Sequence, residues 1–161
     1  MRHAVARWLI GWMVLAALGS GMEQWGAWTS GKMYWASPVT QTIQRANLDG
    51  SQVETLRVAL GEPHGIALDV AKGKMYWTGT SSSDPMVQRA NLDGSAAETL
   101  IRHVGFPLGI ALDVVHSKMY WTQSLHVIQR ANLDGSAVET LVTGLQEPRG
   151  FALDVASGKT E

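Results

Sequence analysis

Three near-copies of one fifteen-residue stretch constrain the fold of this chain more than any other feature of its sequence. The copies read TIQRANLDGSQVETL at 42–56, MVQRANLDGSAAETL at 86–100 and VIQRANLDGSAVETL at 127–141. Two further motifs repeat in step with them, KMYW from Lys32, Lys74 and Lys118, and G-[IF]-ALDV from Gly65, Gly109 and Gly150. The period is about 41 to 44 residues, which is typical of a propeller blade or a solenoid unit.

Each period contains four short segments with the residue pattern of a strand. In GIALDV at 65–70, the large aliphatic residues alternate with Ala67 and Asp69, which is the period-two pattern of an extended strand. KMYW follows after a short turn, a third segment ends at RAN, and a fourth runs through VETL. The Asp–Gly pair of each LDG sequence predicts a tight hairpin turn, with positive φ at Gly50, Gly94 and Gly135.

No segment shows the periodicity of a helix, so the sequence predicts an all-β protein made of four-stranded antiparallel sheets. Aromatic and aliphatic residues occur on both faces of the predicted strands, and each sheet should therefore be covered on both sides. Four-stranded sheets packed between copies of themselves describe a β-propeller. A β-solenoid is the structural alternative, although its coils are usually shorter.

The linked motifs resemble the YWTD repeats, also called low-density lipoprotein receptor class B repeats, which build six-bladed propellers in extracellular receptor-type proteins. The resemblance covers 31–155 and rests on MYW, I-x-RANLDGS and P-x-G-[IF]-ALD in a fixed order. The chain departs from the family where its name motif ends: the aspartate is replaced by Ser37, Gly79 and Gln123, and the preceding threonine is Ala36 in the first copy. In the family that aspartate helps to tie blades together, so its loss bears on blade stability.

The repeats divide the chain into predicted regions. We predict a signal peptide at 1–21, a degenerate lead-in at 22–30, propeller repeats at 31–155 and a truncated tail at 156–161. Within the repeats we expect blade strands at 32–60, 63–102 and 107–144, followed by an orphan strand at 148–155. This amounts to about three blades, roughly half of a six-bladed propeller. Two interpretations follow: the chain is a fragment of a longer six-repeat protein, or a head-to-tail homodimer closes a six-bladed ring.

The N-terminus shows the three zones of a secretory signal. Arg2 and Arg7 precede an apolar run at 8–18, small residues follow at 19–21, and cleavage is expected within 17–21. The apolar run is too short to cross a bilayer, which needs about 20 residues, so no membrane span is predicted. The chain would then be secreted, at the cell surface or periplasmic. A buried N-terminal segment or a misplaced start codon is the alternative interpretation.

Composition excludes several function classes. Thirteen basic and fourteen acidic residues give a net charge of -1, so the chain lacks the basic excess of a nucleic-acid-binding protein. The absence of cysteine excludes disulfides, thiolate metal sites and thiol catalysis.

Residues present in every copy are most simply explained by what every blade needs. The paired rings are predicted to be core residues, namely Tyr34, Trp35, Tyr76, Trp77, Tyr120 and Trp121. An aspartate recurs on the first strand of each blade, and a buried carboxylate needs a partner. These residues are Asp69, Asp113 and Asp154, and the recurring cations that could pair with them are Arg45, Arg89 and Arg130.

A binding site is expected where the copies differ. The turns after the first and third strands of a blade are nearly constant and share one end, whereas the turns after the second and fourth strands vary and share the other. We expect this variable face to recognise a protein or glycan ligand, and neutral drift of the loops is the alternative. The first candidates are His64, Leu108 and Arg149, followed by Pro38, Asp84 and His126.

The sequence predicts no enzyme, metal site or cofactor. NLDGS resembles part of a calcium loop, but the EF-hand order of ligands is not met, and a hairpin turn explains it. Other six-bladed propellers are hydrolases or lactonases whose metal is held by unlike residues from different blades, whereas the acidic residues here are the same in every copy. We therefore predict a non-enzymatic extracellular binding scaffold, with a metal-assisted hydrolase and a self-assembling repeat protein as alternatives.

Overall fold

The structure is a computed structural model that describes residues 31–57, 61–81 and 83–155. The chain divides into two compact units, Met1–Met33 with Ala46–Val53, and Tyr34–Arg45 with Glu54–Glu161. The predicted signal peptide at 1–21, the lead-in at 22–30 and the tail at 156–161 lie outside the described residues.

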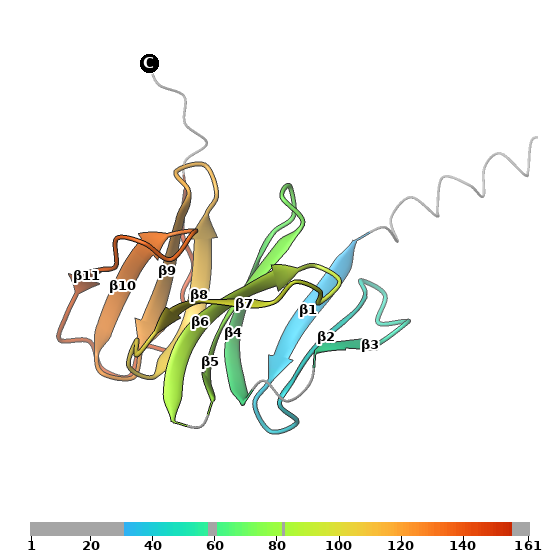
Figure 1. The fold of residues 1–161 in the computed structure, drawn as a ribbon, viewed down its shortest axis with the longest axis horizontal. Coiled ribbons are helices and arrows are strands. Elements are labelled where there is room, and N and C mark those ends of the chain that lie inside the picture. Colours follow the sequence, from blue (N-terminus) through green and yellow to red (C-terminus); the bar gives the residue numbers. More distant parts are fainter. Residues whose placement is uncertain (1–30, 58–60, 82, 156–161) are drawn as a thin grey trace, which may run out of the picture. The chain divides into compact units, whose positions relative to one another are not determined.

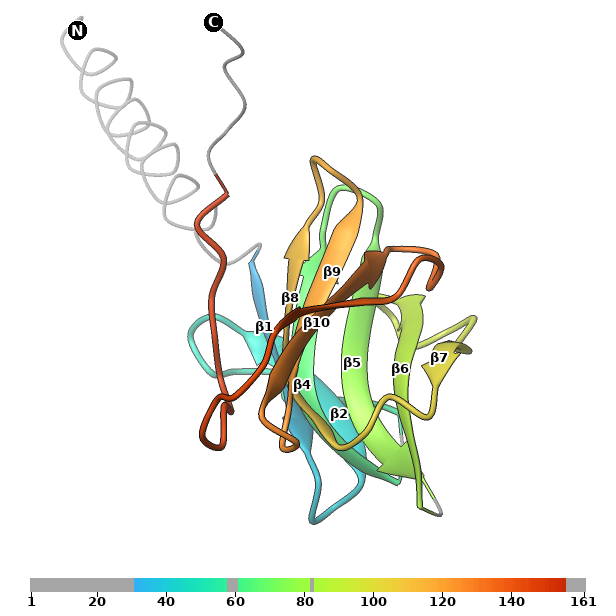
Figure 2. The same ribbon diagram turned by 90° about the vertical axis from the view of Figure 1, so that its left-hand side faces the viewer.

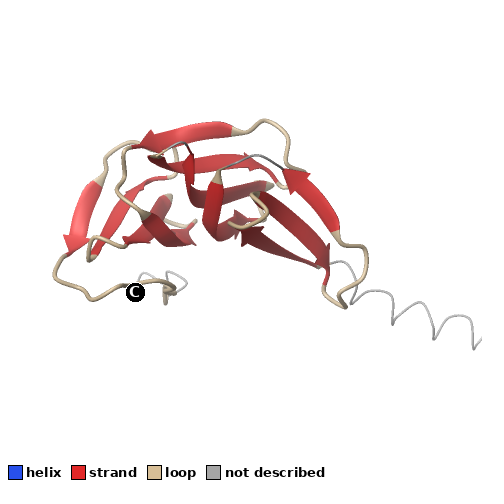
Figure 3. Cartoon of the chain, turned by 90° about the horizontal axis from the view of Figure 1, so that it is seen from below, coloured by secondary structure: helices blue, strands red, loops and turns tan. Residues whose placement is uncertain are grey.

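The described residues form strands and loops without a helix (Figures 1 and 3). The first sheet has the order β1-β2-β3 and consists of β1 (Lys32–Ser37), β2 (Thr42–Asn47) and β3 (Glu54–Arg57). The second sheet consists of β4 (Glu62–Asp69), β5 (Lys74–Ser81), β6 (Asp84–Asn91) and β7 (Glu98–Arg102). The third sheet consists of β8 (Pro107–Asp113), β9 (Lys118–Gln123), β10 (Val127–Asn132) and β11 (Glu139–Val142). The predicted all-β class of small antiparallel sheets is confirmed.

The sequence repeat is matched by a repeat of strand register. Trp77 is paired with Ile66 on β4 and with Gln88 on β6. Its equivalent Trp121 is paired with Ile110 on β8 and with Gln129 on β10. A register shift follows the aliphatic residue of the strand that ends at RAN in each sheet, at Ile43/Gln44, Val87/Gln88 and Ile128/Gln129. The same residues thus produce the same irregularity three times.

The LDG turns have the predicted conformation. The glycine φ values are 82° at Gly50, 85° at Gly94 and 91° at Gly135, a region that only glycine enters without strain. In the turn between β6 and β7, Asp93 Oδ1 accepts hydrogen bonds from Ser95 N at 2.9 Å and Ser95 Oγ at 2.6 Å. These bonds lower the pKa of Asp93 below its usual value, because they stabilise the charged form.

Alternation along the KMYW strands sends the two rings to opposite faces of each sheet. Trp77 shares a buried cluster with Ile43 of the first sheet, whereas Tyr76 lies in a second cluster with Trp121 of the third sheet. The tryptophan of a blade therefore packs toward the preceding sheet, and the tyrosine packs toward the following one. Strands β4 and β8, the first strands of the second and third sheets, lie side by side (Figure 2).

The burial of the predicted core rings follows this alternation. Trp77 and Trp121 are fully buried and Tyr76 is 2% exposed. Trp35 of the first sheet and Tyr120 of the third sheet are half-buried. Each ring lies on the outer face of its sheet, and the described residues form no further sheet against that face. Tyr34, which packs against the second-sheet cluster, is also half-buried.

The segment at 148–155, predicted as an orphan strand, is not a strand in the structure. It keeps one backbone link to the third sheet, because Gly109 N donates to Arg149 O at 3.0 Å. A strand needs a hydrogen-bonded neighbour along its length, and the described residues provide none for Phe151 to Val155.

Candidate functional site

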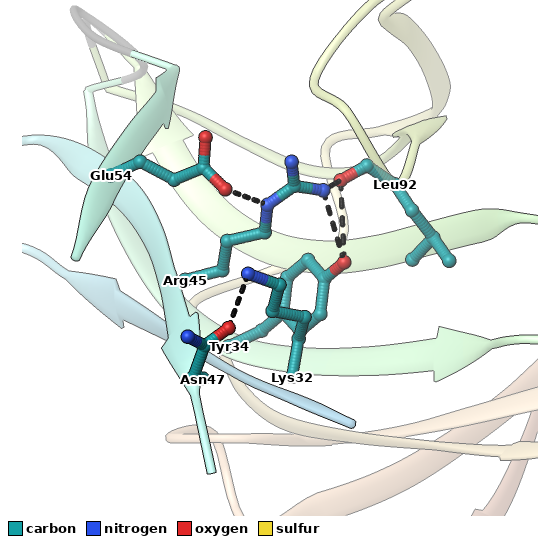
Figure 4. A network of polar contacts seen from close by, with 6 residues as sticks. All are labelled: Lys32, Tyr34, Arg45, Asn47, Glu54 and Leu92. Carbon is teal, nitrogen blue, oxygen red and sulfur yellow. Dashed lines mark hydrogen bonds and ion pairs between the residues drawn. The ribbon is translucent and has the colours of Figure 1, made fainter. Parts of the chain in front are cut away.

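The repeated arginines connect neighbouring sheets. Arg45 Nη1 donates to the carbonyl oxygen of Leu92 at 2.9 Å, and Tyr34 Oη lies 3.4 Å from the same oxygen (Figure 4). Arg45 Nε is also paired with Glu54 Oε1 at 2.5 Å. The bond to Glu54 is the main cause that raises the pKa of Arg45, so the guanidinium stays charged while it holds the next blade's turn.

The next boundary repeats this arrangement. Arg89 Nη1 donates to Leu133 O at 3.2 Å, and the guanidinium lies 5.8 Å from the centre of the Tyr76 ring. Arg89 pairs with Glu98, and Arg130 pairs with Glu139. The expected partnership of these arginines with the first-strand aspartates is therefore wrong, because the glutamate of VETL lies opposite the arginine on the adjacent strand.

Within the smaller unit, Lys32 Nζ donates to Asn47 Oδ1 at 2.6 Å (Figure 4). The lysine of KMYW and the asparagine of RAN make the same bond in the other copies, at 2.6 Å for Lys74 and Asn91 and 2.7 Å for Lys118 and Asn132. This bond explains why both motifs recur together: it ties the ends of two adjacent strands within one sheet.

The first-strand aspartates order the turns that follow them. Asp69 is 2% exposed and its Oδ1 accepts from Lys72 N at 3.1 Å. Asp113 Oδ1 accepts from His116 N at 3.1 Å, and its Oδ2 lies 2.7 Å from His116 Nδ1. The backbone bond from His116 is the main cause that lowers the pKa of Asp113. Asp154, which precedes the undescribed tail, is exposed.

A threonine link between blades was not singled out from the sequence. Thr78 Oγ1 accepts from Gly65 N at 2.9 Å and donates to Leu108 O at 2.5 Å. Thr122 Oγ1 likewise accepts from Gly109 N at 2.9 Å and donates to Arg149 O at 2.7 Å. The threonine after YW in the second and third copies was the available signal.

Glycines let the inner strands approach each other at this link. A Cβ at Gly65 would lie 2.4 Å from Leu108 O, and a Cβ at Gly109 would lie 2.4 Å from Arg149 O. Neither distance is compatible with a side chain, so packing between blades requires glycine at positions 65 and 109.

Four of the predicted binding residues line one hollow of about 300 Å³ in the larger unit. Pro38, His64, Leu108 and Arg149 surround it, and the backbone of three glycines completes its wall, at Gly65, Gly109 and Gly150. His64, Leu108 and Arg149 each precede the glycine of the G-[IF]-ALDV motif and so lie at equivalent points of successive inner segments. The Arg149 side chain is 80% exposed, and its ion pair with Glu147 at 3.8 Å is also exposed. Breaking this ion pair therefore costs little free energy.

The structure does not bring Asp84 or His126 into this hollow. Asp84 Oδ2 pairs with Arg102 Nη1 at 2.5 Å, and its Oδ1 lies 3.2 Å from His103 Nδ1. His126, in the turn between β9 and β10, has a φ of 69° and its carbonyl accepts from Leu145 N at 3.0 Å. Both residues therefore make contacts that stabilise neighbouring loops.

A second hollow of about 380 Å³ lies beside the boundary between the second and third sheets. Its walls include Lys72, Lys74, Arg89, Leu133 and Asp134. Two of these side chains already hold parts of the fold, since Lys74 bonds to Asn91 and Arg89 bonds to Leu133 O. This hollow is therefore mainly a product of blade packing.

No group of three or more His, Asp or Glu side chains within the described part of the chain is arranged to hold a metal ion. The same residues contain no helix of the length and apolarity needed to cross a bilayer.

Comparison with known proteins agrees with the repeat architecture. The family model described as low-density lipoprotein receptor repeat class B matches residues 31–70 and 117–155. The chain is 44% identical over 52 residues to low-density lipoprotein receptor-related protein 5 of Mus musculus, a match that covers 32% of this chain and 3% of that protein. The chain thus spans only a small part of this relative's length.

Solved structures share the fold. A chain in the crystal structure of a nidogen/laminin complex is 25% identical, with a TM-score of 0.70, and the match covers 76% of this chain and 48% of that one. A gluconolactonase of Xanthomonas campestris is 16% identical with a TM-score of 0.53, covering 69% of this chain and 38% of the enzyme's. The second likeness shows the fold alone.

These matches confirm the predicted β-propeller fold and the resemblance on which it was based. The strand register, the ring alternation and the arginine links recur with the sequence motifs. Residues 31–70 and 117–155 are low-density lipoprotein receptor class B, or YWTD, repeats, and the chain has the fold of a β-propeller.

Proposed function

We propose that this chain is a non-enzymatic, extracellular scaffold whose variable face captures a segment of a partner protein. The observation that carries the proposal is the convergence of His64, Leu108, Arg149 and Pro38 on one hollow. These residues differ from copy to copy, whereas the turns after the first and third strands are nearly constant. Individual side chains on a shared frame are the usual basis of recognition by repeat proteins.

The chemistry of the hollow favours a peptide with a small apolar side chain next to a carboxylate. Pro38 and Leu108 supply apolar surface, and the exposed guanidinium of Arg149 supplies a positive charge and a planar set of donors. Arginine suits carboxylate recognition because its donors can bind both oxygens. An apolar anchor with one placed charge is a common pattern in small binding sites.

The similar proteins support binding rather than catalysis. One is named as a receptor-related protein and another was crystallised in a complex of two proteins, nidogen and laminin. Because this chain spans only part of each relative, we use the relatives only to propose that the ligand of this chain is a protein. The predicted signal at 1–21 supports export, and localisation outside the cytoplasm is part of the same proposal.

A displayed library of random peptides, selected on the immobilised chain, tests the proposal. We expect the enriched peptides to contain an acidic residue beside a small apolar one. A variant carrying His64→Ala, Leu108→Ala and Arg149→Ala should bind the enriched peptides at least about tenfold more weakly, which corresponds to about 1.4 kcal/mol.

The matched control carries Lys72→Ala and His116→Ala, two exposed residues of the constant turns. It should bind the same peptides as the wild-type chain does. Equal binding to the triple variant would contradict the proposed site. Hydrolysis of a lactone panel in the presence of calcium by the wild-type chain, lost in the triple variant, would favour the hydrolase alternative.

A further inference from the structure

Both boundaries between sheets are made by the same pair of unlike surfaces. One surface carries the tyrosine and arginine of a sheet, and the other carries the Leu-Asp-Gly turn of the next. Arg45 binds Leu92 O and Arg89 binds Leu133 O. The turn glycines also fit closely, since a Cβ at Gly94 would lie 2.6 Å from Leu56 O and one at Gly135 would lie 2.6 Å from Leu100 O.

Charge contributes to this fit. The arginine of one sheet lies near the aspartate of the next turn, and it helps to lower the pKa of that aspartate, after the larger effect of the serine hydrogen bonds. This holds for Arg45 with Asp93 and for Arg89 with Asp134. The interface is therefore complementary in charge as well as in backbone hydrogen bonding.

The third sheet also presents the first of these surfaces. Arg130 has its ring partner at 5.8 Å and its ion pair with Glu139. No backbone carbonyl accepts from Arg130 within the part of the chain that the structure describes. Leu141, the equivalent of Leu56 and Leu100, is 42% exposed.

The smaller unit presents the second surface. Its turn contains Leu48, Asp49 and Gly50, and Leu48 is 59% exposed whereas its equivalent Leu133 is 6% exposed. A Cβ at Gly50 would meet nothing within 4 Å. The turn has the same internal hydrogen bonds as the two seated turns, since Ser51 N and Oγ donate to Asp49 Oδ1 at 2.9 and 2.6 Å.

We propose that a second copy of this chain seats its Leu48-Asp49-Gly50 turn on the Tyr120–Arg130 side of the third sheet. The occupant is fixed by identity, because this turn repeats the Leu-Asp-Gly sequence and conformation of the two turns already bound by Arg45 and Arg89. In the contact, Arg130 Nη1 donates to Leu48 O, Asp49 lies near the guanidinium, and Gly50 packs on Leu141 O. This association is head-to-tail and does not depend on the proposed capture of a ligand.

Charge reversal with complementation tests the contact on the full chain by sedimentation velocity. The wild-type chain of 17.4 kDa should associate as its concentration rises. Arg130→Glu and Asp49→Lys should each weaken association by at least about tenfold, since each places like charges together. Mixing the two variants should restore it, because the introduced glutamate of one copy would then face the introduced lysine of the other.

Leu48→Lys is the second variant, because it leaves the hydrogen bonds of Asp49 with Ser51 in place. It should also prevent association, since the equivalent Leu133 is buried at its seated turn and Leu92 is half-buried at the other. Circular dichroism checks that each variant keeps its strands. A wild-type chain that stays monomeric at all concentrations would overturn the proposal. So would association that is unchanged in Arg130→Glu and Leu48→Lys.

Discussion

The two boundaries between sheets share one link and differ in another. The arginine link is present at both, with donor–acceptor distances of 2.9 Å at Leu92 and 3.2 Å at Leu133. The threonine link joins the second sheet to the third through Thr78 and Leu108, whereas the first sheet has Ala36 at the corresponding position. The two links are therefore independent. The arginine link is encoded by every RANLDGS copy, whereas the threonine link depends on a single hydroxyl group.

The largest expected effect comes from comparing a tryptophan buried between two sheets with the equivalent tryptophan on the outer side of the first sheet. Trp77→Ala should lower the free energy of unfolding by about 3–5 kcal/mol, because it empties a fully buried position between two sheets. Trp35→Ala should cost a fraction of that, since Trp35 is half-buried and has no sheet against it among the described residues. Urea unfolding at low protein concentration measures both variants. Equal losses would mean that burial between blades is not what stabilises the fold.

A pair of glycines probes the threonine link more locally. Gly109→Ala should destabilise the chain by about 1–3 kcal/mol, the usual cost of overpacking, because the new Cβ would collide with Arg149 O. Gly150→Ala is the matched control, since a Cβ there would meet nothing within 4 Å. Neither glycine has a positive φ, so backbone strain does not confuse the comparison. Thermal unfolding should separate the two variants, and identical melting curves would contradict the close approach.

The smallest expected effect restores the link that the first boundary lacks. Ala36→Thr should stabilise the chain by about 0.5–1.5 kcal/mol, the net contribution of a hydrogen bond, if its hydroxyl reaches His64 O as Thr78 reaches Leu108 O. Ala36→Val is the control, because valine has nearly the same shape without the hydroxyl. Urea unfolding compares the two, and a gain of equal size in Ala36→Val would assign the effect to packing instead.

Much of the fold could be predicted from short spacings in the sequence. The Asp–Gly pairs predicted the turns at Gly94 and Gly135, and recurrence in every copy predicted Trp77 and Trp121 as core residues. The equivalence of His64, Leu108 and Arg149 also followed from the repeat, and the structure places all three on one hollow. Each of these inferences needs only the rule that the same residues at the same spacing take the same conformation.

The errors concern contacts between residues far apart in the chain. Arg45 was expected to serve a first-strand aspartate, but it binds Glu54 and Leu92 O. Asp84 and His126 share an end of the blades with His64, yet neither lines its hollow. A repeat pattern shows that residues are equivalent without showing which partner each meets.

The sequence by itself determined the period, the turns, the strand register and the opposite facing of tyrosine and tryptophan, because these depend on hydrogen bonds and alternation within about fifteen residues. Only the tertiary structure decided that Arg45 reaches Leu92 and that Thr78 reaches Leu108, across separations of 47 and 30 residues. Such bonds form only after two finished sheets have packed together, since packing sets which backbone carbonyls come within reach.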